Sequence, residues 1–432
     1  MIDKYLSIKN IIALHLLIGV VLLIIAVPQL EKVGLKSDSP HYLEIAKHLY
    51  EDGEFAFDYG PTAYRQPGYP FFIYLVYKTF GTEFYFILFA QSMISCFNLF
   101  LFYKIAQIYL DELFSLLAAS IYAIMPLVHL YNVMVMSETL FQLILFLTFL
   151  TFLKKQKYWE ILSGFLIGLL MLIKPYWGIV FIAIAFGLSY STKTEKIISA
   201  RRLAVVAVTI IITVSPWLLR NYSQFGIVGL STNGGVNFWI GNNDEANGGY
   251  LFEEKKDNPL ILDQNEITRN KAGWKLGIEF AGNNPEKYPK LITRKLKRSL
   301  TLPYNEIYYF HFHPKYEFPV QYVSYIPKAE ALITFLPYMF FFLLGVFSIF
   351  HFKQRYIELL VIYISLIGVQ LIFFGAGRFI YPVFPMLIIA SLSLFQIRYK
   401  FKLDKKNLLP IFAVIIAASV WMHDIIKAII YY

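Results

Sequence analysis

The chain has 432 residues, of which 57% are hydrophobic and 18% aromatic, and its mean hydropathy is +0.55. These values are typical of polytopic membrane proteins and exclude an ordinary soluble domain. The single cysteine, Cys96, excludes an intrachain disulfide. The formal charge of +10 is compatible with nucleic-acid binding. The basic residues, however, gather at one end of the predicted spans, as the positive-inside rule requires of a membrane protein. We therefore expect no nucleic acid as a partner.

The apolar runs predict an all-α polytopic protein of about eleven transmembrane helices. The first run, Ile8 to Leu30, would extend about 34 Å as a helix, enough to cross a bilayer. No small-residue cleavage site follows it, so we expect a span and no secretory signal. The predicted spans are residues 8–30, 83–109, 112–131, 137–153, 158–173, 175–190, 203–219, 329–350, 356–375, 379–397 and 408–430.

The stretch between the first two spans, Lys36–Pro70, carries the most distinctive pattern of the chain. A helix is predicted to begin at Pro40, with Ser39 as its cap and Gly53 just past its end. Its apolar residues share one face and its charged residues the other, so we expect it to lie on the membrane surface. The apolar segment Tyr69–Phe80 is too short to cross a bilayer, and we expect it to be interfacial or re-entrant.

Asp38 lies directly before this helix, at the predicted membrane–water boundary. Two interpretations are open. The carboxylate is either a helix-capping acid at the positive end of the helix, or a functional group of a site at the outer boundary.

Basic residues gather at one end of the predicted spans. With a cytoplasmic N-terminus, the inner loops hold many lysines and arginines, whereas the short outer connections carry only Lys174 and Arg378. By the positive-inside rule, this predicts a multi-pass protein of the cytoplasmic (inner) membrane with its N-terminus inside. Lys174 and Arg378 break the rule. They either snorkel to the interface or belong to a site at the external, periplasmic face.

One hydrophilic insertion, residues 220–327, interrupts the spans on the outer side, and we expect it to form a small external mixed domain. It begins with the Gly/Asn-rich stretch Ser231–Tyr250, which favours turns and short extended segments. A helix capped by Asp263, with Glu266 as capping-box partner, should follow, and then a basic amphipathic helix from Pro285. The predicted domains are an N-terminal transmembrane region at 1–219 with its first outer loop at 31–82, the external domain at 220–327, and C-terminal transmembrane helices at 328–432.

Ionisable residues from distant parts of the sequence meet at the outer boundary in this topology. Two carboxylates and several cations suit a lipid-anchored phosphate substrate, because cations hold a phosphate and a carboxylate accepts a proton from an attacking hydroxyl. Glu138 could instead be a capping residue at the start of its span. No pattern of a phosphate-cradling Gly loop, a zinc cluster or a nucleophile elbow occurs. The residues are Asp38, Arg65, Glu138, Lys174, Arg220 and Arg378.

Seven short motifs follow one another along the chain. They are D-S-x-x-Y from Asp38, R-x-P-G-Y-P from Arg65, M-S-E-T-L-F from Met136, K-P from Lys174, P-W-x-x-R-N-Y-x-x-F-G from Pro216, G-G-V-N-F-W-I-G-N-N from Gly234 and G-R-F-x-Y-P-x-F-P from Gly377. In this order and topology the chain resembles the GT-C membrane glycosyltransferases, specifically the bacterial branch related to protein O-mannosyltransferases and the lipid A aminoarabinose transferase. No single motif is specific, but their order covers nearly the whole chain.

The resemblance implies a glycosyltransferase that moves a hexose or pentose from a polyprenyl-phosphate-linked donor on the external membrane face, usually with inversion. Asp38 would be the catalytic acidic residue, acting as base or as ligand to a divalent metal ion bound with the phosphate. Glu138 would be the second acidic residue, near the acceptor. Arg65, Lys174 and Arg378 would bind the donor phosphate. The remaining candidates, on the acceptor side or in the loops, are Tyr42, Tyr64, Arg220 and Asn242.

The chain departs from its relatives in two respects. It has a single acid, Asp38, where the O-mannosyltransferases carry paired acids, and its external domain is small, without an evident peptide-binding module. A glycan or lipid hydroxyl is therefore favoured over a protein acceptor. One alternative is a polysaccharide ligase or polymerase with a lipid-diphosphate donor, which usually has a large outer loop late in the chain. Another is a lipid-glycan transporter or flippase, whose functional charges should lie mid-span.

Overall fold

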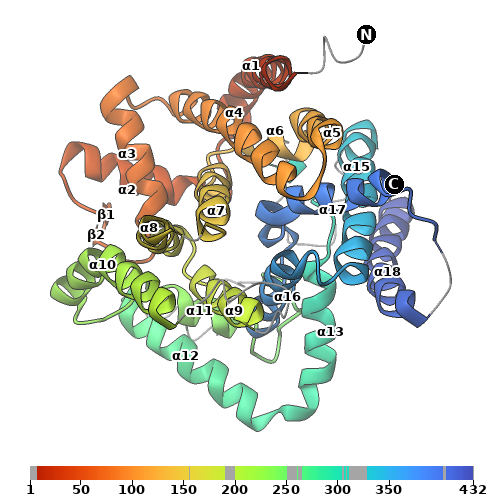
Figure 1. Ribbon diagram of the computed structural model, residues 1–432. Coiled ribbons are helices and arrows are strands. Elements are labelled where there is room, and N and C mark those ends of the chain that lie inside the picture. Colours follow the sequence, from red (N-terminus) through yellow and green to blue (C-terminus); the bar gives the residue numbers. More distant parts are fainter. Residues whose placement is uncertain are drawn as a thin grey trace.

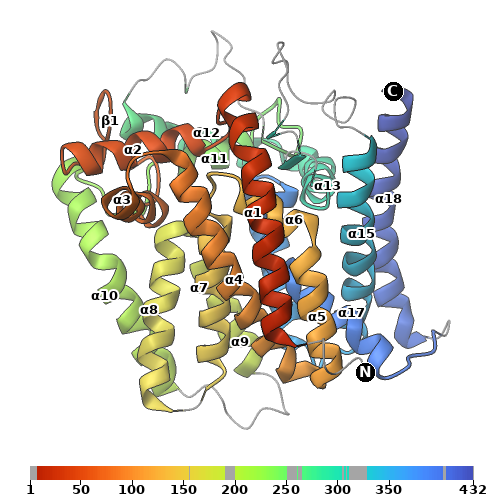
Figure 2. The same ribbon diagram turned by 90° about the horizontal axis from the view of Figure 1, so that it is seen from above.

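A bundle of upright helices with shorter helices lying across one end makes up the fold (Figures 1 and 2). The computed structural model describes residues 7–154, 156–189, 200–250, 260, 265–303, 306–307, 309–310, 328–401 and 405–431. The upright helices of the N-terminal region are α1 (Ile8–Val33), α4 (Phe84–Tyr109), α5 (Glu112–Ile124), α7 (Glu138–Phe152), α8 (Lys157–Ile173), α9 (Trp177–Ser189) and α10 (Ala200–Phe225). Those of the C-terminal region are α15 (Lys328–His351), α16 (Ile357–Ile372), α17 (Phe384–Gln396) and α18 (Leu408–Tyr431).

Each of the eleven predicted spans coincides with one of these helices, which confirms an all-α polytopic membrane fold. By length and composition, six helices of the described chain can cross a membrane, or seven if a bent pair counts as one span. Three further apolar helices are shorter, at 138–152, 158–173 and 357–372. The number of spans therefore stays a prediction, although the positions of the helices agree with it.

The predicted span 112–131 is not one straight helix. It breaks into α5 and α6 (Pro126–Asn132), which are bent by 53°. Pro126 lacks an amide hydrogen and disfavours a helical conformation at the residue before it, so the helix stops at Met125. The break leaves the carbonyl of Ala123 near two buried imidazoles, with His15 Nδ1 at 3.0 Å and His129 Nε2 at 2.7 Å. These two contacts satisfy the hydrogen-bonding capacity of the Ala123 carbonyl, for which no water is available inside a membrane.

Both short helical segments predicted for the first outer loop are present, as α2 (Ser39–Glu51) and α3 (Gly68–Phe80). Between them lies a short antiparallel hairpin of β1 (Ala56–Phe57) and β2 (Gly60–Pro61), which was not predicted from the sequence. Helix α2 buries the apolar face expected from its sequence. Ser39 is the first helical residue and not the cap. Its hydroxyl contacts the Val135 carbonyl at 2.9 Å and the Tyr309 hydroxyl at 2.7 Å, so it ties the start of α2 to two distant segments.

The described part of the external segment is helical. It comprises α11 (Gly234–Ile240), α12 (Glu266–Asn283), a 3₁₀ turn at Pro285–Lys287 and α13 (Tyr288–Ser299), which lie at the same end of the bundle as α2 and α3 (Figure 2). Asp263 lies outside the described residues. The cap of α12 is Asn265, whose side chain accepts from the amides of Ile267 and Thr268.

The expectation of turns throughout Ser231–Tyr250 was wrong for residues 234–240, which form α11. Tertiary packing outweighs the low helix propensity of the glycines there. A Cβ on Gly235 would lie 1.9 Å from the Asn270 carbonyl oxygen, and one on Gly273 would lie 2.4 Å from the Gly235 carbonyl oxygen. The glycines are therefore needed for the close approach of α11 and α12.

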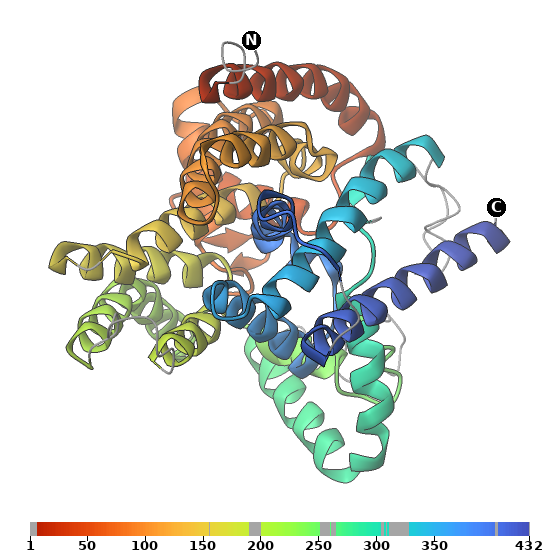
Figure 3. The same cartoon turned by 45° about the vertical axis from the view of Figure 1, so that its right-hand side comes forward.

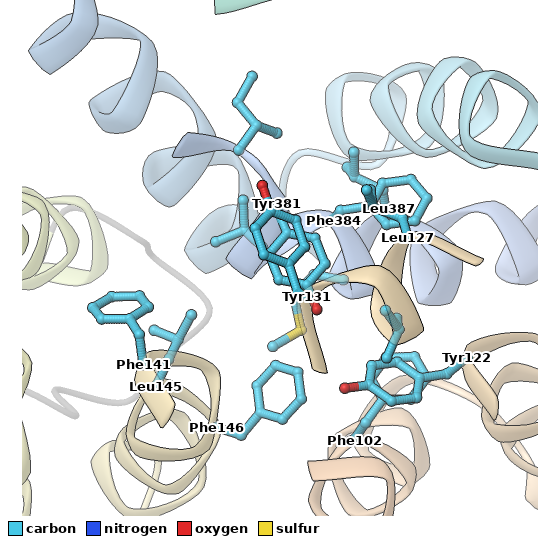
Figure 4. Close-up of a cluster of buried hydrophobic side chains, with 14 of the residues drawn as sticks. Phe102, Tyr122, Leu127, Tyr131, Phe141, Leu145, Phe146, Tyr381, Phe384 and Leu387 are labelled. Atoms are coloured by element: carbon cyan, nitrogen blue, oxygen red, sulfur yellow. The ribbon is translucent and has the colours of Figure 1, made fainter. Parts of the chain in front are cut away.

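Aromatic side chains fill the middle of the bundle (Figure 4). Tyr131 of α6 stacks on Tyr381, with the ring centroids 3.9 Å apart, and Phe384 at the start of α17 is fully buried beside them. This packing joins the bent helix pair to the segment that precedes α17. The Tyr131–Tyr381 contact therefore fixes the positions of α6 and of the segment before α17 relative to each other.

The orientation can be tested by labelling in a Cys96→Ala background. Ala200→Cys lies at the predicted inner end of α10, and Lys290→Cys lies on the exposed side of α13. With a cytoplasmic N-terminus, a membrane-impermeant maleimide should label Lys290→Cys in intact cells and Ala200→Cys only after permeabilisation. The reverse pattern would contradict the orientation and the external position of the site.

Candidate active site

Asp38 lies at the junction of α1 and α2 and is not a helix cap through its side chain. The preceding residue, Ser37, has φ 61, a left-handed conformation that turns the chain sharply. The Asp38 carboxylate faces two guanidinium groups. Its Oδ1 accepts from Arg65 Nη2 at 2.7 Å, and its Oδ2 accepts from Arg378 Nη1 at 3.2 Å. Asp38 thus occupies the N-cap position of α2, but its carboxylate pairs with the two arginines and makes no capping hydrogen bond.

Arg65 comes from the segment between the hairpin and α3. Its guanidinium lies over two aromatic rings, 5.5 Å from the centroid of Tyr42 and 5.1 Å from that of Tyr64. It also donates to Nδ1 of His41 at 2.8 Å, so this imidazole is neutral. The rings of Tyr42 and Tyr64, which were candidates for the acceptor side or the loops, thus contact the guanidinium group of Arg65 and fix its orientation.

Arg378 and Lys174 both point to carboxylates and not away to the surface. Arg378 lies in a 3₁₀ turn, Gly377–Phe379, before α17, and contacts Asp38. Lys174 follows α8, and its Nζ donates to Glu138 Oε1 at 2.9 Å. Glu138 is only 1% exposed, and its other oxygen has no hydrogen-bond partner within the described chain. Glu138 is in the first turn of α7 but makes no capping bond there.

The three ion pairs, Asp38–Arg65, Asp38–Arg378 and Glu138–Lys174, form one electrostatic cluster, which contains all five of the predicted catalytic and phosphate-binding residues. Burial opposes ionisation of the Asp38 carboxyl, but the positive charges of Arg65, Arg378 and Lys174 outweigh it and hold the pKa of this carboxyl well below its usual range. Asp38 is therefore ionised at neutral pH. Residues that are 27 to 340 positions apart in sequence meet in this cluster.

Two candidates lie apart from the cluster. Arg220 donates to the carbonyl oxygens of Thr62, at 2.6 Å, and Phe55, at 2.9 Å, so it fastens the hairpin region to α10. Asn242 is 1% exposed, and its amide donates to the carbonyls of Phe238 and Ile372. The side chains of both residues are occupied by structural contacts, and neither reaches the carboxylates of the cluster.

The sequence interpretation missed a third buried carboxylate. Glu306 is 4% exposed and accepts from the Tyr131 hydroxyl at 2.5 Å. It also interacts electrostatically with Arg378 and Glu138. Nothing in its sequence neighbourhood distinguishes it, because it lies in the external segment, which was expected to remain outside. A second missed group is the Tyr176 hydroxyl, which is buried without a partner in the described structure and interacts with the same two charges.

An apolar groove adjoins the cluster on the side of α8 and α10. Its volume is about 550 Å³. Three of its lining residues, Gly68, Leu140 and Ile173, are within three positions of Arg65, Glu138 and Lys174 respectively. The other lining residues are Leu49, Gly53, Phe55, Pro67, Phe71, Ile144, Leu169, Leu172, Thr213, Pro216, Trp217 and Arg220.

The residues around Asp38 do not form a divalent-metal site as arranged. Both carboxylate oxygens accept from guanidinium groups, and such cations repel a metal ion. In the described part of the chain, no three His, Cys, Asp or Glu residues are grouped so that they could hold a metal. We therefore derive no step that passes through a metal ion bound to Asp38.

Comparisons with known proteins bear on the family and the fold of the chain. Residues 64–219 match the dolichyl-phosphate-mannose-protein mannosyltransferase family. The fold is similar to that of the oligosaccharyltransferase AglB from Archaeoglobus fulgidus in complex with an inhibitory peptide and a dolichol-phosphate, with TM-score 0.52 and 14% identity over 99% of this chain and 56% of that chain. ArnT from Cupriavidus metallidurans, bound to undecaprenyl phosphate, has TM-score 0.49 and 13% identity over 93% of this chain and 63% of that chain.

The chain thus spans 56% and 63% of the lengths of these two structures. A comparison with curated proteins finds no match. The family match covers residues 64–219, about a third of the chain, and agrees with the resemblance to the GT-C membrane glycosyltransferases. The helices and the similarity to AglB show a multi-pass membrane protein with this type of fold.

Two histidines of α2 should respond to acid in opposite directions. Burial and the neighbouring Arg65 lower the pKa of His41 to about 4, whereas hydrogen bonds to Asp52 and then Asp58 raise the pKa of His48. An unfolded histidine titrates near ~6.5. As pH falls from 7 to 5, His41 therefore costs stability, because only the unfolded state takes up its proton, and His48 adds stability.

We expect His41→Gln to reduce the fall in melting temperature between pH 7 and pH 5, and His48→Gln to increase it. Thermal melts of both variants and the wild type in the same detergent measure this. Equal shifts in the two variants would contradict the neutral state assigned to His41.

Proposed function

We propose that this protein transfers a sugar from a polyprenyl-phosphate donor to a hydroxyl group of a glycan or lipid, on the external face of the membrane. The observation that carries the proposal is the position of Asp38 between Arg65 and Arg378, next to the Lys174–Glu138 pair. These groups lie at the end of the bundle where α2, α3 and the external helices are found (Figure 2).

The charges of the cluster suit a phosphate diester. Three cations, Arg65, Lys174 and Arg378, face two carboxylates, Asp38 and Glu138. Guanidinium groups bind phosphate oxygens through paired N–H donors, which favours the two arginines as the main phosphate ligands.

In the proposed reaction, the acceptor oxygen attacks the anomeric carbon of the donor and the bond from that carbon to the phosphate oxygen breaks. The electron pair of the broken bond stays on the phosphate, where the cations stabilise the added charge. The proton of the acceptor hydroxyl passes to the Asp38 carboxylate. Attack opposite the leaving phosphate inverts the anomeric configuration. Glu138, which has one oxygen without a hydrogen-bond partner among the described residues, would orient the acceptor.

The apolar groove supports an isoprenoid carrier. It is lined mainly by aliphatic and aromatic side chains, and it begins next to the residues that would hold the phosphate. The dolichyl phosphate in the name of the matched family and the dolichol-phosphate bound by AglB are chemically related to such a donor. A polysaccharide ligase or polymerase with a lipid-diphosphate donor is the alternative, and a flippase would move the lipid without consuming the sugar.

The experiment that tests the proposal supplies purified protein in nanodiscs with a panel of polyprenyl-phosphate and polyprenyl-diphosphate sugars and candidate acceptors. Release of free polyprenyl phosphate, with gain of the sugar by the acceptor, would support the proposed reaction. Consumption of diphosphate donors alone would support the ligase or polymerase, and movement of intact lipid across the bilayer would support the flippase.

Asp38→Asn should abolish most of the transfer, because an amide cannot accept the proton. General base catalysis is typically worth about 10²–10⁴-fold, so we expect at least an about hundredfold lower transfer rate. The variant should also melt at a lower temperature, because two guanidinium groups lose a charged partner. Rates are therefore compared per folded enzyme. The exposed Asp244→Asn is the matched control. A rate for Asp38→Asn within a few-fold of the control would exclude Asp38 as the base.

Filling the groove should discriminate between long and short lipid chains. Leu169→Trp places a large ring among the groove residues, whereas Ile161→Trp lies on the same helix at an exposed position outside it. We expect Leu169→Trp to weaken undecaprenyl phosphate binding about tenfold, since apolar contact area is lost, and to leave geranyl phosphate binding unchanged. Equal affinities for undecaprenyl phosphate in both variants would show that the chain binds elsewhere.

A further inference from the structure

The loop that delivers Arg378 to Asp38 is enclosed by the external helices. It begins at Phe373, directly after α16. The amide of Gly375 donates to the Gly248 carbonyl at 2.8 Å, and the amide of Ala376 donates to Gln370 Oε1 at 2.8 Å. The position of Arg378 therefore depends on residues far from the cluster.

The enclosure leaves no space for side chains at three glycines. A Cβ on Gly241 would lie 1.6 Å from the Phe373 carbonyl oxygen, and one on Gly375 would lie 2.1 Å from the Lys295 carbonyl oxygen. A Cβ on Gly377 would lie 2.6 Å from the Thr301 carbonyl oxygen. The backbones of the loop and of the external segment are thus in direct contact on both sides of the loop.

Lys295 of α13 is the polar centre of this contact. It has no exposed surface, and its ammonium donates to Asn242 Oδ1 at 3.0 Å and to the carbonyls of Leu371 and Ile372 at 3.0 and 3.2 Å. Three acceptors match its three N–H donors. The two carbonyls belong to the last turn of α16, where the helix dipole is negative and favours a cation.

Asn242 completes the arrangement. Its amide donates to the Ile372 carbonyl at 3.0 Å, and its oxygen also accepts from the Tyr288 hydroxyl at 2.9 Å. Burial lowers the pKa of Lys295 to about 8, so the side chain is still an ammonium at neutral pH. Burying a charge costs free energy. The Lys295 ammonium donates its hydrogen bonds to Leu371 and Ile372, immediately before the Arg378 loop.

We propose that Lys295, with Asn242, is a positioning residue that holds the Arg378 loop in the geometry needed to bind the donor phosphate. This inference rests on the proposed function. Neither side chain touches the cluster, so both act through the end of α16 and the loop that follows it. Asn242, first considered for the acceptor side, belongs to this positioning unit.

The test is a double-mutant cycle read out as affinity for undecaprenyl phosphate in nanodiscs. Lys295→Met removes the ammonium at nearly constant length, and Lys297→Met, two residues away and exposed, is the control of equal charge change. Lys295→Met should weaken binding about tenfold in the wild-type background and cause no further loss in the Arg378→Ala background, because coupled residues are not additive. Lys297→Met should change neither.

Each other result has a defined meaning. Unchanged affinity in Arg378→Ala alone would overturn the phosphate role of Arg378 and with it the proposed function. If Arg378→Ala weakens binding but Lys295→Met does not, or weakens it equally in both backgrounds, the positioning role is overturned and the proposed function stands. If Lys295→Met does not fold, Asn242→Ala replaces it in the same cycle, with a smaller loss of about threefold expected in the wild-type background only.

Discussion

The candidate site depends on one contact, in which the Asp38 carboxylate is shared by Arg65 and Arg378. The Asp38 side chain is only 19% exposed, so its charge depends on both partners staying in place. The contact therefore constrains three separate parts of the chain at once: the α1–α2 junction, the segment before α3 and the turn before α17. In Figure 3, as in Figure 1, the blue helices of the C-terminal region lie between the red and orange N-terminal elements and the blue-green helices α12 and α13.

The external segment contacts both of the segments that carry these arginines. On the side of Arg65, Glu266 at the start of α12 accepts from the Thr62 hydroxyl at 2.6 Å and from the Ala63 amide at 2.8 Å. On the side of Arg378, α13 encloses the loop after α16 through Lys295. The helices of the external segment are thus part of the scaffold that holds the two guanidinium groups around Asp38.

The sequence predicts the helices and the five central site residues for the same physical reason. Lipid demands long apolar helices, and it makes each charge at the outer boundary conspicuous, so Lys174 and Arg378 could be singled out before any contact was known. The bend before Pro126, the helix at 234–240 and the buried state of Glu306 could not be predicted in this way. The bend is a local effect of Pro126, which the apolar run alone does not show. The helix at 234–240 and the burial of Glu306 depend on tertiary contacts, a glycine-mediated backbone approach and a tyrosine on a distant helix, that leave no periodic pattern.

The shared carboxylate also bears on how Asp38 could act as a base under the proposed function. A general base works best with a pKa near the working pH, yet in the free protein the neighbouring cations hold the pKa of Asp38 well below its usual range. A donor phosphate would compete for those same cations, because guanidinium binds phosphate and carboxylate with similar geometry. Each hydrogen bond that Asp38 gives up raises its basicity, so the bound donor would itself prepare the base. It follows that the donor should bind before the acceptor, and that the carboxylate stays inert, paired with arginine, until a phosphate arrives.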